Sequence, residues 1–150
     1  MLGALTFGAK VAMSALPNIE PVSLFIMVFA AVLGLKCLYP VYVYVALEIL
    51  INGINVWNIP YLYIWAILWG VAMLLPRRMP KAVAAIVYPT VCALHGLLYG
   101  VLYAPAQALI FGLDFDGMIA WIIAGFPFDL LHGLGNLVAG FLILPLSHLL

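Results

Sequence analysis

The sequence predicts an all-α polytopic membrane protein, and three observations carry this prediction. Of the 150 residues, 69% are hydrophobic and only 7% are charged, whereas a soluble domain carries about 25% charged residues. The apolar runs extend over whole helix lengths, without the period-two alternation of a membrane β-barrel. A spanning helix uses about 20 residues and a turn about five more, so this length predicts roughly six spans. We therefore expect a single transmembrane domain, residues 1–150, built as a bundle of six helices.

Proline, glycine and charged residues divide the chain into the six expected helices. The first retains Lys10 inside its apolar run and has no charged segment before it, which argues against a cleaved signal peptide. The weakest boundary is Gly34–Pro40; without it, the count falls to five. The strongest is Pro76–Lys81, which holds three of the five basic residues. The predicted helices are Leu2–Leu16, Pro21–Leu35, Tyr39–Gly53, Pro60–Leu75, Lys81–Tyr103 and Met118–Leu146.

The distribution of charge predicts the orientation. If the chain starts inside the cell, the inner turns hold four basic residues and the outer turns hold none, which matches the positive-inside rule. Both termini are therefore predicted to be cytoplasmic, and the alternation favours an even number of spans. The inner basic residues are Lys36, Arg77, Arg78 and Lys81, and the outer acidic residues are Glu20, Asp114 and Asp116.

Several function classes lack the residues they need. With five basic and five acidic residues, the chain has no basic face for nucleic acid and no polybasic patch for anionic lipid. Cys37 and Cys92 have no CxxC spacing, so we interpret both as packing residues. No phosphate-binding loop, HExxH or GxSxG motif is present. We expect no enzymatic activity, no catalytic residue, no metal site and no cofactor.

Ionisable side chains inside the predicted spans are energetically costly and by default mark functional sites. Here they are Lys10, Glu48, His95, Asp129 and His132. Asp129 follows Pro127 closely, and the polarity there exceeds what packing requires. Helical spacing adds further polar and aromatic residues on the same faces, and these faces together predict a ligand pocket. The predicted substrate-binding residues are Glu48, Asn52, Tyr61, Trp65, His95, Tyr99, Asp129, His132 and Asn136.

Structural interpretations of the same residues stay open at this point. Lys10 and Glu48 could neutralise each other as an ion pair without any ligand. His95 could be a hydrogen-bonded core residue. Trp65 and Trp69, which share a helical face with Tyr61, could be interfacial anchors facing lipid.

The first helix carries a surface of small residues that would let another helix approach closely. Lys10 and Ser14 lie on the opposite side of that helix. This asymmetry predicts docking to a partner protein, with packing against the chain's own helices as the alternative. The predicted docking residues are Ala4, Gly8 and Ala12.

The chain resembles the substrate-binding S component of energy-coupling factor (ECF) type vitamin transporters. The segments that carry the resemblance are Ala15–Val22 (ALPNIEPV), Ile59–Leu62 (IPYL) and Phe126–Asn136 (FPFDLLHGLGN), together with the small-residue first helix. The resemblance implies a multi-pass protein of the prokaryotic plasma membrane that binds a micronutrient in its outer half. It implies that Pro17–Pro21 and Ala104–Gly117 are gating loops.

The resemblance also implies partners and a substrate class. The partners would be a transmembrane coupling subunit, contacted through Ala4, Gly8 and Ala12, and two cytoplasmic ATPases. Metal-specific relatives carry a histidine after the initiator methionine, and Leu2 stands there, which argues against nickel or cobalt. Aromatic rings and carboxylates suit a flat heterocycle such as thiamine, its pyrimidine precursor or a pyridine vitamin. The alternatives are a six-span scaffolding protein of the cell-shape type, without a ligand, and a stand-alone ion-coupled carrier.

Overall fold

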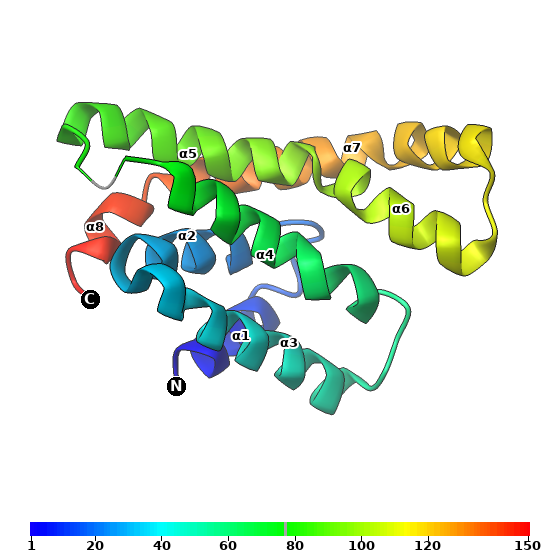
Figure 1. The fold of residues 1–150 in the computed structure, drawn as a ribbon, viewed down its shortest axis with the longest axis horizontal. Coiled ribbons are helices and arrows are strands. Elements are labelled where there is room, and N and C mark those ends of the chain that lie inside the picture. The colour runs from blue at the N-terminus through cyan, green and yellow to red at the C-terminus, as the bar shows by residue number, and fades with distance from the viewer. Residues whose placement is uncertain (77) are drawn as a thin grey trace.

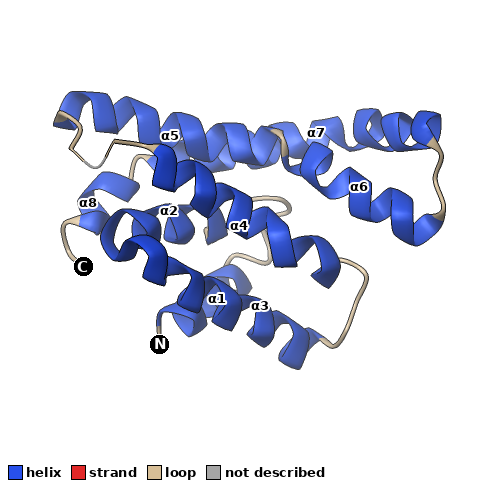
Figure 2. Cartoon of the chain, in the orientation of Figure 1, coloured by secondary structure: helices blue, strands red, loops and turns tan. Residues whose placement is uncertain are grey.

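The all-α prediction is confirmed. The computed structural model describes residues 1–76 and 78–150, and this part of the chain is helical with no β-strand (Figures 1 and 2). The helices are α1 (Leu2–Ala12), α2 (Val22–Leu33), the 3₁₀ helix η1 (Gly34–Cys37), α3 (Leu38–Asn52), α4 (Asn58–Leu74), α5 (Lys81–Leu97), α6 (Tyr99–Phe111), α7 (Phe115–Gly140) and α8 (Ile143–Ser147).

Three helical stretches of the described residues are long and apolar enough to cross a membrane. They are Val22–Asn52, Lys81–Phe111 and Phe115–Gly140. The first contains a break at Gly34, whose φ of 57° lies in the left-handed region that favours glycine. Trp69 donates from Nε1 to the Gly34 carbonyl oxygen at 3.1 Å. The turn predicted on the weakest sequence signal is therefore present, and a side-chain hydrogen bond from α4 holds it.

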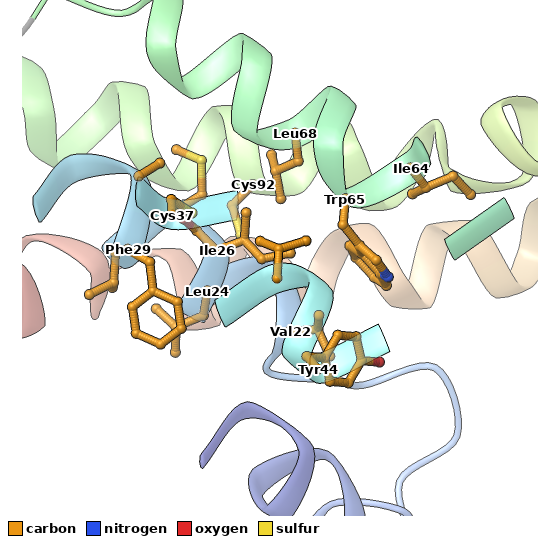
Figure 3. Packing of buried hydrophobic residues seen from close by; sticks show 14 of the residues in the cluster. Val22, Leu24, Ile26, Phe29, Cys37, Tyr44, Ile64, Trp65, Leu68 and Cys92 are labelled. Atoms are coloured by element: carbon orange, nitrogen blue, oxygen red, sulfur yellow. Dashed lines mark hydrogen bonds between the residues drawn. The ribbon is translucent and has the colours of Figure 1, made fainter. Parts of the chain in front are cut away.

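Helix α2 forms the centre of the bundle. It is almost entirely apolar, and most of its side chains are buried, as expected for a helix that lies inside a protein or spans a membrane. Helices α4, α5, α7 and α8 pack around it. Figure 3 shows its side chains Val22, Ile26 and Phe29 among residues from the surrounding helices.

The closest helix pair is α5 with α7, which run side by side in opposite directions (Figure 1). Glycines permit this approach: a Cβ on Gly96 would lie 2.8 Å from the backbone nitrogen of Gly133, and one on Gly140 would lie 2.5 Å from the Cα of Pro89. Small residues at helix contacts are a means by which membrane helices come close enough for extensive van der Waals contact.

The two ends of the molecule differ in charge. The α4–α5 connection and both termini lie toward one end of the long axis, and the α6–α7 connection lies at the other (Figure 1). Lys81 follows the first connection, and Asp114 and Asp116 lie at the second. Arg77 lies outside the described residues. This separation follows the predicted charge pattern, while the side of a membrane on which each end lies stays a prediction.

Three predicted helix ends are wrong. The sixth predicted helix, Met118–Leu146, is divided into α7, which ends at Gly140, and α8. Helix α1 ends at Ala12 rather than Leu16. Residues 13–16 form turns instead, with hydrogen bonds from Ser14 N to Val11 O and from Leu16 N to Met13 O. The fifth predicted helix does not end at Tyr103.

Residues implied to form a gating loop are instead helical. Helix α6 continues through Pro105 to Phe111, so only Gly112–Asp114 of the implied Ala104–Gly117 loop is non-helical. Pro105 has no backbone N–H donor, yet α6 is continuous on both sides of it. The helical break instead falls at Leu98, between α5 and α6.

We predict that Gly96→Ala destabilises the protein, because its methyl group would be forced against the backbone of α7. Overpacking of this kind costs about 1–3 kcal/mol. Thermal unfolding in detergent, followed by circular dichroism, measures the loss. The control is Gly125→Ala on α7, where a Cβ meets no atom within 4 Å. Equal melting temperatures for the two variants would contradict the close α5–α7 contact.

Candidate functional site

The candidate site lies beneath the α1–α2 loop, residues 13–21, where two neighbouring cavities are found. The first, the polar cavity, has a volume of about 460 Å³ and is lined by Lys10, Glu48 and Asn52 among others. The second, the aromatic chamber, has a volume of about 170 Å³. Asn18 and Glu20 of the loop line both cavities. The loop that the resemblance implies to be a gate, Pro17–Pro21, therefore covers the site.

Lys10 is the centre of the polar cavity. Its Nζ atom lies 2.9 Å from Glu48 Oε1 on α3 and 3.9 Å from Glu20 Oε2 on the loop. It also donates a hydrogen bond to the Tyr61 hydroxyl on α4, at 3.2 Å. Asn52 donates to the second Glu48 oxygen at 2.8 Å. The ion pair left open by the sequence thus exists, and both of its members line a cavity.

Glu20 completes an excess of negative charge at this point. Two carboxylates face one ammonium group. Burial raises the pKa of the Glu20 carboxyl, and the nearby Lys10 ammonium opposes that rise. The ring of Tyr61, with its centroid 5.1 Å from Lys10 Nζ, adds a cation–π contact. The cavity is therefore suited to holding positive charge.

The aromatic chamber is lined by rings from three helices. Tyr61 comes from α4, Tyr99 and Tyr103 from α6, and His132 from α7. The ring centroids of Tyr99 and His132 are 4.8 Å apart, and those of Tyr99 and Tyr103 are 6.1 Å apart. His132 Nε2 is buried, and no hydrogen-bond partner is found for it in the described part of the chain. A bound molecule with a polar edge could supply one.

Below the chamber, the helices are joined by a chain of hydrogen bonds. Asn136 Nδ2 donates to Ser23 Oγ at 3.1 Å, and Ser23 Oγ lies 3.3 Å from His95 Nδ1. The second His95 nitrogen, Nε2, lies 3.4 Å from the Ile64 carbonyl oxygen. The consistent assignment is that Nε2 carries the proton and Nδ1 accepts from Ser23. His95 is thus a hydrogen-bonded residue of the core, with its ring centroid 6.2 Å from that of Tyr99.

Trp65 connects this core to the chamber. It is fully buried, which excludes the interpretation that it anchors the protein at a lipid interface. Its ring lies 5.5 Å from that of Tyr61 and 5.8 Å from that of Tyr99, measured between centroids. Trp69, on the same helical face, instead binds the Gly34 carbonyl away from the site.

Asp129 has a structural partner. Both of its carboxylate oxygens lie 3.1 Å from the backbone nitrogen of Gly100, in the first turn of α6. A carboxylate at a helix N-terminus accepts a hydrogen bond from a free backbone N–H group and interacts favourably with the helix dipole. A Cβ at position 100 would clash with Asp129 Oδ2, so a larger residue there would displace the carboxylate from its present position. Asp129 therefore stabilises the break that brings Tyr99 and Tyr103 to the chamber.

The sequence-predicted residues fall into three groups. Glu48 and Asn52 line the polar cavity. Tyr61, Tyr99 and His132 line the aromatic chamber, and Trp65, His95 and Asn136 lie buried in the core beneath it. Asp129 is separate from these groups and faces a groove on α6 and α7.

Sequence reasoning did not place four residues of this region in the site: Asn18, Glu20, Ser23 and Tyr103. Ser23 is the one hydroxyl-bearing residue in the otherwise apolar sequence of α2, and this could have marked it as a candidate. Asn18 and Glu20 lie between two prolines. The prolines predict a loop but do not indicate which part of the molecule the loop covers.

The predicted docking surface faces outward. Ala4, Gly8 and Ala12 are all exposed, and a Cβ on Gly8 would meet no atom within 4 Å. The contact of α1 with α3 is instead made through Gly3, whose added Cβ would lie 2.6 Å from the Pro40 carbonyl oxygen. The alternative that this surface packs against the chain's own helices is therefore excluded, while docking to a partner stays a prediction.

Comparison with known proteins gave no relatives. No family model matches the chain, no curated protein matches it, and no solved structure matches its fold.

We predict that Lys10→Met destabilises the protein more than Glu48→Gln does. Removing Lys10 leaves the Glu48 carboxylate buried and unpaired, a loss of about 3 kcal/mol or more. After Glu48→Gln, the Lys10 ammonium keeps its contacts with Glu20 and Tyr61. The double variant should recover part of the stability lost in Lys10→Met. Thermal unfolding of all four proteins measures the coupling, and strictly additive effects would contradict it.

Proposed function

We propose that this protein is the substrate-binding membrane subunit of an ECF-type importer for a small vitamin or vitamin precursor. The supporting observation is the pair of cavities beneath the α1–α2 loop, where an excess of carboxylate meets a set of aromatic rings. Binding pockets typically combine apolar and aromatic walls with a few polar groups that orient the ligand. No part of this proposal requires the chain itself to catalyse a reaction.

The ligand class follows from the groups that line the cavities. Tyrosine rings offer flat faces for stacking, and carboxylates with aromatic faces favour positive charge. His132 Nε2 and Asn52 can hydrogen-bond to the edge of a heterocycle. A flat heterocycle with hydrogen-bonding edges, such as thiamine, its pyrimidine precursor or a pyridine vitamin, suits these groups. The ligand would enter on the outer side and be delivered inward.

Delivery requires partners, since the sequence holds no nucleotide-binding motif. In the proposal, the outward surface of Ala4, Gly8 and Ala12 contacts a transmembrane coupling subunit, which two cytoplasmic ATPases drive. The protein would lie in a prokaryotic plasma membrane as six spans with both termini inside. Its three long apolar stretches are compatible with that location.

A scaffolding membrane protein is the second candidate. It is favoured by the way buried charges find partners within the chain: Lys10 pairs with Glu48, and Asp129 accepts from Gly100. Such a protein would have no use for a pocket, so the retention of a ligand distinguishes the two candidates.

We predict that a vitamin or precursor changes the intrinsic tryptophan fluorescence of the purified protein. Trp65 adjoins the chamber through Tyr61 and Tyr99, so its emission should respond to occupancy. The measurement is a titration with thiamine, its pyrimidine precursor and the pyridine vitamins, alongside native mass spectrometry for a retained molecule. Tyr99→Leu should weaken binding by about tenfold, the equivalent of roughly 1.4 kcal/mol.

The control is Tyr88→Leu, which alters a tyrosine that lines a cavity beside Lys36, away from the site. It should leave the affinity unchanged. If no compound alters the emission and no small molecule is retained, the scaffolding candidate replaces the proposal.

We predict that Gly8→Leu combined with Ala12→Leu abolishes co-purification with the coupling subunit, because the added side chains prevent close helix approach. Ligand-dependent fluorescence should persist, since both residues point away from the cavities. Gly70→Leu, which also adds bulk at an open glycine, serves as the control and should leave the complex intact. An intact complex in the double variant would exclude this docking surface.

A further inference from the structure

A third cavity lies beside the aromatic chamber. This groove, of about 400 Å³, is formed by the α3–α4 connection, α6 and α7. Its lining includes Trp57, Trp121, Phe128 and Asp129, and Trp57 and Phe128 are exposed. Tyr99 and Tyr103 line the groove and the chamber alike. Among the residues that the structure describes, these two tyrosines alone are common to the two cavities, so they form the partition between them.

The partition is held by ring packing. The ring of Tyr103 stacks on that of Trp121 with a centroid distance of 5.6 Å and an interplanar angle of 19°. On its other side, it lies 6.1 Å from the ring of Tyr99. Both tyrosines are partly exposed. A change of side-chain rotamer at Tyr103 would open the partition without separating any charges.

The opposite approach to the chamber, through the polar cavity, is closed more strongly. Lys10 joins α1 to α3 and α4 there, through Glu48 at 2.9 Å and the Tyr61 hydroxyl at 3.2 Å. Opening this side would separate an ion pair whose Glu48 member is almost fully buried. Breaking such a pair leaves an uncompensated buried charge and is strongly unfavourable.

We propose that the groove is the entrance to the aromatic chamber, with Tyr103 as its movable partition. This proposal rests on the proposed function, because it assumes that the chamber holds a ligand. The chemistry of the groove suits the same compounds: aromatic side chains form much of its wall, and Asp129 also lines it. An aromatic or cationic molecule would find similar contacts before and after the partition.

Cysteine labelling tests the entrance without any knowledge of the ligand. The native thiols of Cys37 and Cys92 are fully buried, so a cysteine placed in the chamber by His132→Cys is the reactive thiol. The reagent is 2-aminoethyl methanethiosulfonate, a small cation. The groove is obstructed by Gly125→Trp, since Gly125 lines it and a Cβ there meets no atom within 4 Å. A second reporter, Tyr61→Cys, replaces the first if His132→Cys does not fold.

Two controls carry the same bulk elsewhere. Ser14→Trp obstructs the polar cavity, which Ser14 lines, and Gly70→Trp adds a ring at an open glycine of α4. We expect Gly125→Trp to slow labelling by about tenfold or more, which corresponds to an added barrier of roughly 1.4 kcal/mol. Both controls should label at the rate of the reporter protein alone.

The entrance is overturned if Ser14→Trp slows labelling and Gly125→Trp does not, or if neither has an effect. These outcomes leave the proposed function standing, because ligand binding is measured separately by fluorescence. Conversely, if the protein binds no compound but shows the expected labelling pattern, the entrance is supported and the proposed function is contradicted.

Discussion

The partly exposed ammonium group of Lys10 ties α1 to the rest of the bundle. Lys10 contacts Glu48 on α3, Tyr61 on α4 and Glu20 on the α1–α2 loop, so a single side chain ties together the elements that enclose the polar cavity. In apolar surroundings, a charge of this kind must be paired, and its partners must be held in place. The same requirement explains why the loop lies over the cavity: Glu20 reaches Lys10 only when residues 13–21 fold inward.

Much of the fold followed from the sequence, because a membrane-type composition leaves few alternatives to helices and because proline and glycine mark most of their ends. One error arose because a contact distant in sequence decides where a helix ends. The helical break at Leu98 is stabilised by Asp129, which lies 29 residues from Gly100 along the chain. No residue next to Leu98 in the sequence predicts this break. The fifth predicted helix ended at Tyr103, whereas α6 continues through Pro105 to Phe111. The apolar run of the first helix extended to Leu16, whereas α1 ends at Ala12.

The candidate site was predictable in its residue types and less so in its arrangement. Charged and polar residues are rare in this sequence, so Glu48 and His132 stood out on energetic grounds alone. Helical spacing does not show which of these residues face a cavity and which form hydrogen bonds with one another. His95 and Asn136 proved to be joined through Ser23, whereas His132, four residues before Asn136, keeps a free nitrogen beside the chamber. That difference depends on what the neighbouring helices contribute.

The shortness of α1 has an electrical consequence in the proposed membrane setting. Its 11 residues rise about 16 Å, roughly half of a hydrocarbon core about 30 Å thick. Solvent in the polar cavity above its end would bring a conducting phase deep into the bilayer. The membrane voltage would then fall across a thinner insulating layer, and the field within that layer would be correspondingly stronger. A charged molecule crossing this layer would gain or lose the same total electrical energy, but over a shorter distance.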